Sequence, residues 1–187
     1  MRIISGKLKG YTLHLPVDDK TRPLKDMARE SIFNLLSHSN KISVQLKNSN
    51  VLDLYAGTGS FGLECLSREA AGVFFVENEK SAFEILKKNI HKLKMEKRTK
   101  VSLNGVFEEL EKLKKKALRF DLIFCDPPFK NENISKLIES IFNKNLLNSK
   151  GIIIIHRNKE TNENFPDYFK IIDERKYGLS KIIFGKF

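Results

Sequence analysis

Residues 51–62 read Val51-Leu52-Asp53-Leu54-Tyr55-Ala56-Gly57-Thr58-Gly59-Ser60-Phe61-Gly62. In this stretch an apolar run leads into a glycine-rich turn, and an amphipathic segment follows. That order is typical of a first β-strand, a loop that faces a phosphate or a nucleotide, and a helix. Gly57 and Gly59 can take backbone angles that a side chain would forbid, and they let a ligand approach the main chain. We expect Ser60 to cap the helix that opens there.

A second apolar run, Val73-Phe74-Phe75-Val76, ends in Glu77. A carboxylate at the end of that strand can accept hydrogen bonds from both hydroxyls of a ribose. Residues 51–77 therefore predict a βαβ unit that holds a cofactor containing adenosine. The G-x-G-x-x-G pattern of residues 57–62 occurs in sites for NAD, FAD and S-adenosylmethionine (SAM), so it does not choose among them. A tight turn with no ligand is the remaining alternative.

Two further features favour SAM. Asp53 lies at the end of the first strand, four residues before Gly57. A carboxylate there would repel a pyrophosphate, but it can bind the ammonium group of a methionine, directly or through water. The second feature is the run Phe120-Asp121-Leu122-Ile123-Phe124-Cys125-Asp126-Pro127-Pro128-Phe129, which reads as a buried strand that ends in Asp-Pro-Pro-Phe.

The Asp-Pro-Pro-Phe turn suits the methylation of an exocyclic amino group, whose lone pair is delocalised into the ring of the base. Asp126 and the carbonyl of Pro127 can localise that lone pair by accepting hydrogen bonds from both N–H groups. Phe129 offers a face on which an extruded base can stack, a contact worth about 1–3 kcal/mol. Because a sulfonium methyl is already activated, the task is positioning and charge placement, with no metal and no covalent nucleophile. A Pro-Pro turn capped by Asp126 is the purely structural alternative.

The composition predicts one globular domain with a basic surface. The 187 residues are enough for one substantial core, and no apolar run approaches the length of a membrane span. The two cysteines, Cys65 and Cys125, and the four scattered histidines do not suggest a disulfide, a metal site or a histidine-based triad. The net charge of +11 favours a nucleic acid as partner, although a genome biased toward lysine and asparagine would produce the same charge. We expect a cytoplasmic protein with no membrane partner.

Alternating apolar runs and amphipathic stretches predict an α/β fold. Strands are predicted over residues 51–54, 73–76, 101–103, 121–125, 151–156, 169–173 and 180–187, and helices over 25–37, 81–94, 108–118 and 134–143 besides the one after the glycine turn. This order predicts a mostly parallel, seven-stranded sheet with helices on both faces and antiparallel strands at the end. Ser81 is the expected N-cap of helix 81–94. We expect a single domain over residues 1–187, in which residues 1–40 form an extension with a β-hairpin of residues 2–5 and 11–15 and a helix.

These motifs resemble the class I SAM-dependent methyltransferases of the amino-group type, which have a Rossmann-like fold. More narrowly, the chain resembles the RsmD family of small-subunit (16S) ribosomal RNA guanine-N2 methyltransferases. The resemblance covers nearly the whole chain, and the blocks that carry it are Arg2-Ile3-Ile4-Ser5-Gly6, Thr21-Arg22-Pro23, Asp26-x-x-Arg29-Glu30-x-x-Phe33-Asn34, residues 53–59, residues 126–129 and Tyr177-Gly178. The N-terminal blocks are the most specific, since the motifs of residues 53–59 and 126–129 occur across many methyltransferases.

The resemblance implies a role for each site residue. Catalysis would involve Asp126, Pro127 and Phe129. SAM would be bound by Asp53, Tyr55, Gly57 and Gly59 at its methionine end, by Glu77 at its ribose, and by Asn104, Gly105 and Val106 at its adenine. Arg22, Pro128 and Phe129 would contact the substrate, with residues 21–23 as a lid over the cofactor. The chain departs from the family pattern at Leu24, which follows the lid block in place of a small polar residue, and its basic connector around Lys41 and Lys47 is not specific to the family. Asn104 stands where many relatives in the wider class carry Asp.

The implied substrate is a guanine in small-subunit ribosomal RNA, either free or in an assembling 30S particle, and the implied enzyme is a monomer. Three alternatives stay open. A methyltransferase for adenine N6 or another amino group in DNA or RNA would use the same Asp126 and Pro127. An NAD-dependent oxidoreductase would leave Asp53 and residues 126–129 unexplained. A non-catalytic RNA-binding module would not need an intact Asp126 or an intact glycine turn.

Overall fold

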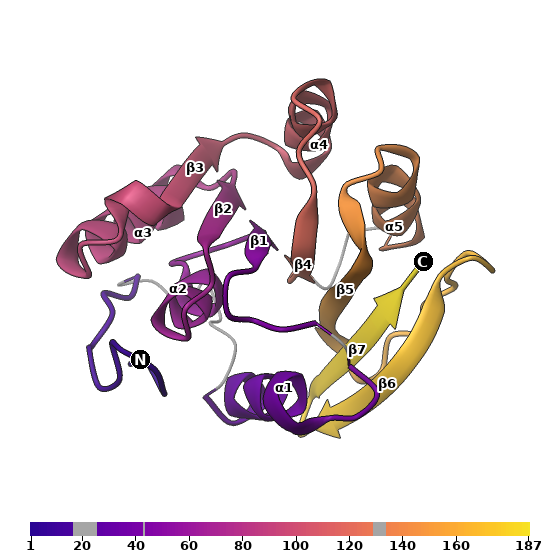
Figure 1. Cartoon of the computed structure of the whole chain (residues 1–187), viewed down its shortest axis with the longest axis horizontal. Helices are drawn as coiled ribbons and strands as arrows, with labels where there is room; N and C mark the ends of the chain where they lie inside the picture. The colour runs from indigo at the N-terminus through magenta and orange to yellow at the C-terminus, as the bar shows by residue number, and fades with distance from the viewer. Residues whose placement is uncertain (17–25, 43, 129–133) are drawn as a thin grey trace.

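The computed structural model describes residues 1–16, 26–42, 44–128 and 134–187 (Figure 1). Within them the elements follow the order α1 (Asp26–His38), β1 (Asn50–Leu54), α2 (Ser60–Ser67), β2 (Gly72–Glu77), α3 (Lys80–Lys92), a 3-10 turn (Glu96–Arg98), β3 (Thr99–Leu103), α4 (Val106–Lys115), β4 (Phe120–Cys125), α5 (Ile134–Asn143), β5 (Leu147–Asn158), β6 (Lys170–Tyr177) and β7 (Ser180–Lys186). The strands form one seven-stranded sheet in the order β3-β2-β1-β4-β5-β7-β6.

The sheet is parallel from β3 to β5 and antiparallel from β5 through β7 to β6. This pattern confirms the predicted Rossmann-like fold with antiparallel strands at its end. The strand order reverses at β1, because β2 and β3 lie to one side of it and β4 lies to the other. In open α/β sheets, ligands bind outside the carboxyl ends of the strands at such a reversal. The fold therefore directs attention to the ends of β1 and β4.

Helices cover both faces of the sheet (Figure 1). One core cluster joins α1, α2 and α3 to one face, and a second joins α4 and α5 to the other. In β5, Ile152 and Ile154 belong to the first cluster, whereas Ile153 and Ile155 belong to the second. Because successive side chains of a strand point to opposite faces, an unbroken isoleucine run is what a strand buried on both faces requires. Over the described ranges, no helix has the length and apolar character of a membrane span.

The N-terminal strap, defined here as residues 1–16, corrects the predicted hairpin. Its two arms form a single antiparallel bridge, Arg2 with Thr12, flanked by backbone hydrogen bonds of Ile3 with Tyr11, Gly10 with Ile3 and Leu13 with Met1. The pairing stops there because Glu64 of α2, which is fully buried, accepts the backbone N–H groups of Ile4 at 2.7 Å and Ser5 at 2.9 Å. Those N–H groups are thereby unavailable to a partner strand. The strap is held by α2 more than by its own second arm.

Asn89 of α3 ties the same strap to the glycine-rich turn. Its side-chain oxygen accepts the N–H of His14 at 2.7 Å, and its amide nitrogen donates to the carbonyls of His14 at 3.1 Å and Thr58 at 3.0 Å. Asn89 is fully buried, so a loss of these partners would leave polar atoms without hydrogen bonds in the core. The strap and the turn after β1 are therefore one connected unit.

Both predicted serine caps are wrong by one or two positions. Ser60 is the first residue of α2, and Gly59 precedes it as the N-cap with φ +83°. The cap of α3 is Glu79, whose side chain accepts the N–H of Ser81. At the first site the turn demands a left-handed backbone, which glycine adopts at no steric cost. Helix α4 also starts earlier than predicted, at Val106 with Gly105 as its cap.

Candidate active site

The glycine-rich turn after β1 holds three residues in the left-handed region, Tyr55 (φ 60°), Gly57 (φ 54°) and Gly59 (φ 83°). A Cβ atom on Gly59 would lie 2.3 Å from Cδ1 of Leu86, so packing against α3 requires this glycine. A Cβ atom on Gly57 would meet nothing within 4 Å, so the main chain there faces open space. A left-handed non-glycine residue such as Tyr55 costs about 1–3 kcal/mol, and such strain concentrates at ligand sites.

Asp53 lies in β1 beneath this turn, with only 1% of its surface exposed. Its Oδ2 accepts the backbone N–H of Gly62 at 2.9 Å, which joins the strand to the first turn of α2. Burial raises the pKa of this carboxyl well above its usual range, the Gly62 bond opposes that shift, and the charges of Asp126 and Glu77 add to it. A buried carboxylate that is electrostatically disfavoured in this way is suited to a cationic ligand.

Glu77 ends β2 and holds the glycine turn from the other side. Its Oε2 accepts the N–H of Gly57 at 2.6 Å, and its Oε1 accepts the N–H groups of Asn78 at 2.9 Å and Glu79 at 2.8 Å. A carboxylate has about four acceptor positions, so three bonds leave capacity for a hydroxyl donor. The side chain therefore fixes the turn and can also receive a ligand.

The loop of residues 104–106 follows β3, and the pairing of Leu103 with Glu77 brings it beside the end of β2. Asn104 donates from Nδ2 to Oγ of Ser102 at 2.8 Å and to Oε2 of Glu109 at 2.9 Å. Gly105 caps α4 and Val106 is buried at its start. The three residues that the sequence assigns to adenine therefore stand next to the residue assigned to ribose.

Asp126 follows β4 directly beside β1, since its N–H donates to the carbonyl of Leu54 at 3.4 Å. Its side chain is 22% exposed. Pro127 is buried and Pro128 is exposed, and the carbonyl of Pro128 accepts a hydrogen bond from Nη1 of Arg157 at 3.5 Å. The structure thus brings Asp126, Asp53 and the glycine turn together at one sheet edge. The predicted Arg22 and Phe129, with Thr21, Pro23 and Leu24, lie outside the described residues.

His156 is a site residue that the sequence analysis missed. Its Nδ1 lies 2.7 Å from Oδ1 of Asp126, and its Nε2 lies 2.9 Å from Oγ of Ser180. An ionised carboxylate only accepts hydrogen bonds, so Nδ1 donates to Asp126, and in the neutral imidazole Nε2 then accepts from the Ser180 hydroxyl. The available signal was positional: Asp126 and His156 each follow the apolar run of a strand, and Cys125 pairs with Ile155 in the sheet. We call these three residues the Asp126–His156–Ser180 chain.

Comparison with known proteins agrees with this geometry. A family model described as "Conserved hypothetical protein 95" matches residues 1–186. The Ribosomal RNA small subunit methyltransferase D of Buchnera aphidicola subsp. Acyrthosiphon pisum is 35% identical, covering 84% of this chain and 78% of that protein. The protein of the same name from Haemophilus influenzae is 30% identical, covering 96% of this chain and 90% of its own length.

A solved structure agrees with these sequence relatives. The yhhF protein of Escherichia coli superposes with a TM-score of 0.82 at 27% identity, covering 99% of this chain and 96% of that one. The match therefore extends from the strap to the last strands and is not confined to the glycine turn. The chain belongs to the Conserved hypothetical protein 95 family, together with the small-subunit ribosomal RNA methyltransferases D, as its motifs predicted.

Proposed function

We propose that this chain is a SAM-dependent methyltransferase that methylates the N2 amino group of a guanine in small-subunit (16S) ribosomal RNA, free or in an assembling 30S particle. The observation that carries the proposal is the placement of Asp126 and Pro127 directly after β4, the strand that pairs with β1 beside buried Asp53 and its glycine turn. The relatives named as ribosomal RNA small subunit methyltransferases support rRNA as the substrate. The choice of guanine N2 rests on the resemblance of the N-terminal blocks.

The residues present fit SAM. Asp53 supplies buried negative charge for the cationic methionine end, and Tyr55, Gly57 and Gly59 shape the turn above it, with open space at Gly57. Glu77 has acceptor capacity left for a ribose hydroxyl, and the loop of residues 104–106 would lie beside the adenine. When bound, the cofactor supplies a methyl group already activated by its sulfonium. The chain therefore has to bind the cofactor and the target base, orient them, and remove a proton from the target amine.

Asp126 and Pro127 act on the target amino group. The Asp126 carboxylate accepts one N–H of the amine, stabilises the positive charge that develops on the nitrogen as the N–C bond forms, and receives the proton that leaves, while the Pro127 carbonyl accepts the other N–H. His156 holds Asp126 in one orientation through the 2.7 Å contact. Pro128, Phe129 and Arg22 contact the RNA in this proposal. The target base leaves its stack, at a cost of a few kcal/mol that stacking and the amino hydrogen bonds offset.

The identity of the product tests this function. Unmodified 16S rRNA, 30S particles and duplex DNA are incubated separately with the protein and with SAM that carries a labelled methyl group. Nucleoside mass spectrometry is expected to find the label in N2-methylguanine from an RNA sample. Asp126 and Pro127 would serve an adenine amino group equally well, so label in N6-methyladenine, or label confined to DNA, would overturn the proposal while leaving the cofactor assignment intact.

His156→Leu is expected to lower turnover by about 10²-fold, because Asp126 loses the contact that orients it and a displacement of about 1 Å can cost that much. Affinity for SAM should be nearly unchanged, because Asp126 and Ser180, the residues that His156 hydrogen-bonds, are not assigned to the cofactor. His156→Asn, whose amide N–H can replace Nδ1, should recover part of the rate, and Ser180→Ala should cost less than either. Single-turnover rates and calorimetry measure these quantities. Equal rate losses for the Leu and Asn variants would indicate a packing role.

A further inference from the structure

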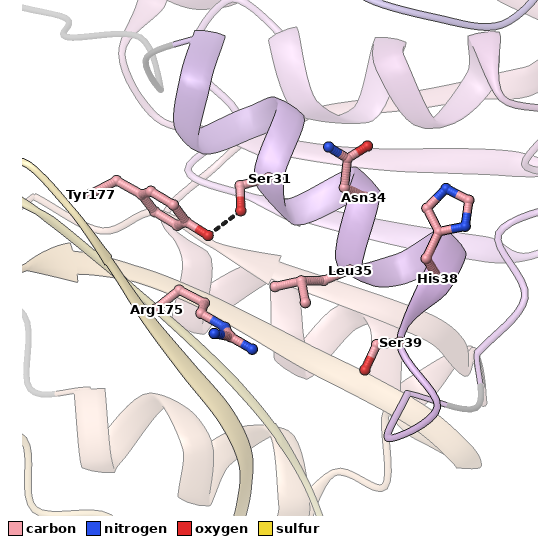
Figure 2. Close-up of a pocket in the computed structure, with 7 residues that line it drawn as sticks. All are labelled: Ser31, Asn34, Leu35, His38, Ser39, Arg175 and Tyr177. Carbon is pink, nitrogen blue, oxygen red and sulfur yellow. Dashed lines mark hydrogen bonds between the residues drawn. The ribbon is translucent and has the colours of Figure 1, made fainter.

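A groove between α1 and β6 is lined by residues that have not been assigned to the cofactor or to the target base. Its volume is about 650 Å³. Ser31, Asn34, Leu35 and His38 line it from one face of α1, Ser39 follows the helix, and Arg175 and Tyr177 line it from β6 (Figure 2). The helical residues are spaced by three and four positions, which puts them on one stripe of the helix. The groove therefore joins segments far apart in the sequence. The hydroxyl of Tyr177 and Oγ of Ser31 form a hydrogen bond between its two sides.

Strand register places this groove beside the active site. Arg175 pairs with Ile182 of β7, and Ile182 pairs with His156 of β5. Residues directly opposite each other in a sheet share a face, so Arg175 and His156 both face α1, about two strand spacings or 10 Å apart. Tyr177 pairs with Ser180, whose hydroxyl contacts His156. The groove thus begins where the Asp126–His156–Ser180 chain ends.

The lining has the chemistry of a site for single-stranded nucleic acid. The Arg175 side chain is 49% exposed, and its Nη2 lies 3.0 Å from Oδ2 of Asp173, the acidic group on the same face of β6. The Asp173 side chain is only 9% exposed and keeps this bond, but a guanidinium carries five N–H donors, so Arg175 can offer its other donors to a phosphate at the same time. Tyr177 adds an aromatic ring for a base, and Asn34, His38 and Ser39 add polar groups.

We propose that the groove binds a nucleotide of the single-stranded RNA segment that flanks the target base. Arg175 contacts its phosphate, and the ring of Tyr177 lies against its base. This inference rests on the proposed function, because it gives that reaction a second point of attachment for the RNA. Two such points, three strand spacings or about 14 Å apart across the sheet, hold the strand in register while the target base turns toward Asp126.

A pair of neighbouring substitutions separates a specific contact from general positive charge. Lys176 adjoins Arg175, and its exposed side chain lies beside Glu174, on the opposite face of β6. Arg175→Gln and Lys176→Gln therefore each remove one positive charge from the same strand. The probe is a fluorescent single-stranded RNA of about 12 nucleotides, within the range of known single-strand footprints. Anisotropy titrations over a series of salt concentrations give the slope of log affinity against log salt.

Arg175→Gln is expected to make that slope less negative by about 0.7, which is the contribution of one phosphate contact on a single strand. Lys176→Gln should leave the slope near that of the unmodified protein. Tyr177→Leu should weaken RNA binding about five-fold or more, whereas Tyr177→Phe, which keeps the ring, should retain most of it. Equal slope changes for the Arg175 and Lys176 variants would overturn the inference. Calorimetry with SAM confirms that each variant is folded.

The two proposals fail in distinguishable ways. RNA in which uridines are replaced by 4-thiouridine can be crosslinked to the unmodified protein, and the crosslinked peptides can be mapped by mass spectrometry. Crosslinks to Tyr177 or to α1 without any methylated product would retain the groove and overturn the proposed reaction. A methylated guanine together with an unchanged slope for Arg175→Gln, and crosslinks elsewhere, would overturn the groove alone.

Discussion

Asp126→Ala is expected to lower methyl transfer by about 10²–10⁴-fold, the range for removal of a group that manages a proton in the transition state. SAM affinity should change little, because Asp126 is assigned to the target amine. Its side chain is partly exposed at the sheet edge and contacts His156, so truncation leaves the strands beneath it intact. Single-turnover kinetics with saturating RNA, compared with calorimetry for SAM, separates the two effects.

Asp121 provides a matched control at the opposite end of the same strand. It accepts hydrogen bonds from the N–H of Asn50 at 2.8 Å and from Nδ2 of Asn148 at 2.7 Å, away from the glycine turn. Asp121→Ala therefore removes a carboxylate from β4 and lowers stability, but the folded protein should keep its rate. A loss of SAM affinity in Asp126→Ala that equals its loss of rate would make Asp126 a structural residue.

Asp53→Asn is expected to weaken SAM binding by about 30-fold or more, the factor that corresponds to about 2 kcal/mol for removing one partner of a buried charge pair. The same substitution should raise the stability of the protein without ligand near neutral pH. Asparagine can still accept the Gly62 N–H, but it carries no buried charge. Calorimetry and thermal unfolding measure the two opposite effects. A parallel loss of affinity and stability would contradict the assigned role.

The pH dependence of these effects has a definite sign. Burial, with the charges of Asp126 and Glu77, raises the pKa of Asp53 above its ordinary value of 3.8. The folded protein therefore favours the protonated carboxyl, and the stability from that preference is complete below pH 3.8 and is lost as pH rises through the raised pKa. The stability advantage of Asp53→Asn should grow over the same window. Binding of SAM to the unmodified protein should weaken as the pH falls through the raised pKa of Asp53, because protonation removes the negative charge of this carboxyl.

Local sequence was sufficient for the strands and turns that carry the cofactor site. The run 152–155 and the run 122–125 are apolar at every position, and only a strand covered on both faces requires that composition. The helix predicted over residues 134–143 has those bounds because its apolar face is strongly periodic. The helix N-caps were harder to predict from the helix sequences. Gly59 is the N-cap because the turn there needs a left-handed backbone, and Glu79 is the N-cap because its side chain accepts the N–H of Ser81.

Tertiary register, which no local pattern contains, was needed for the rest of the site. His156 looks isolated in the sequence, and it reaches Asp126 only because β4 and β5 are neighbours in parallel register. The hairpin of the strap was overpredicted because its alternation was visible whereas the competing acceptor, Glu64, lies 60 residues away. The groove lining was invisible for the same reason, since Ser31 and Tyr177 are 146 residues apart.

The contacts of the strap also bear on how the chain folds during its synthesis. The strap leaves the ribosome before α2 and α3, so Ile4 must wait for Glu64, 60 residues later, and His14 must wait for Asn89, 75 residues later. Contacts between such distant residues form slowly, because a long loop must close before any contact is gained. Helix α1 waits longer still, for β6 and Tyr177. A growing chain therefore can form the turn after β1 well before the groove between α1 and β6, which needs residues synthesised about 100 residues later.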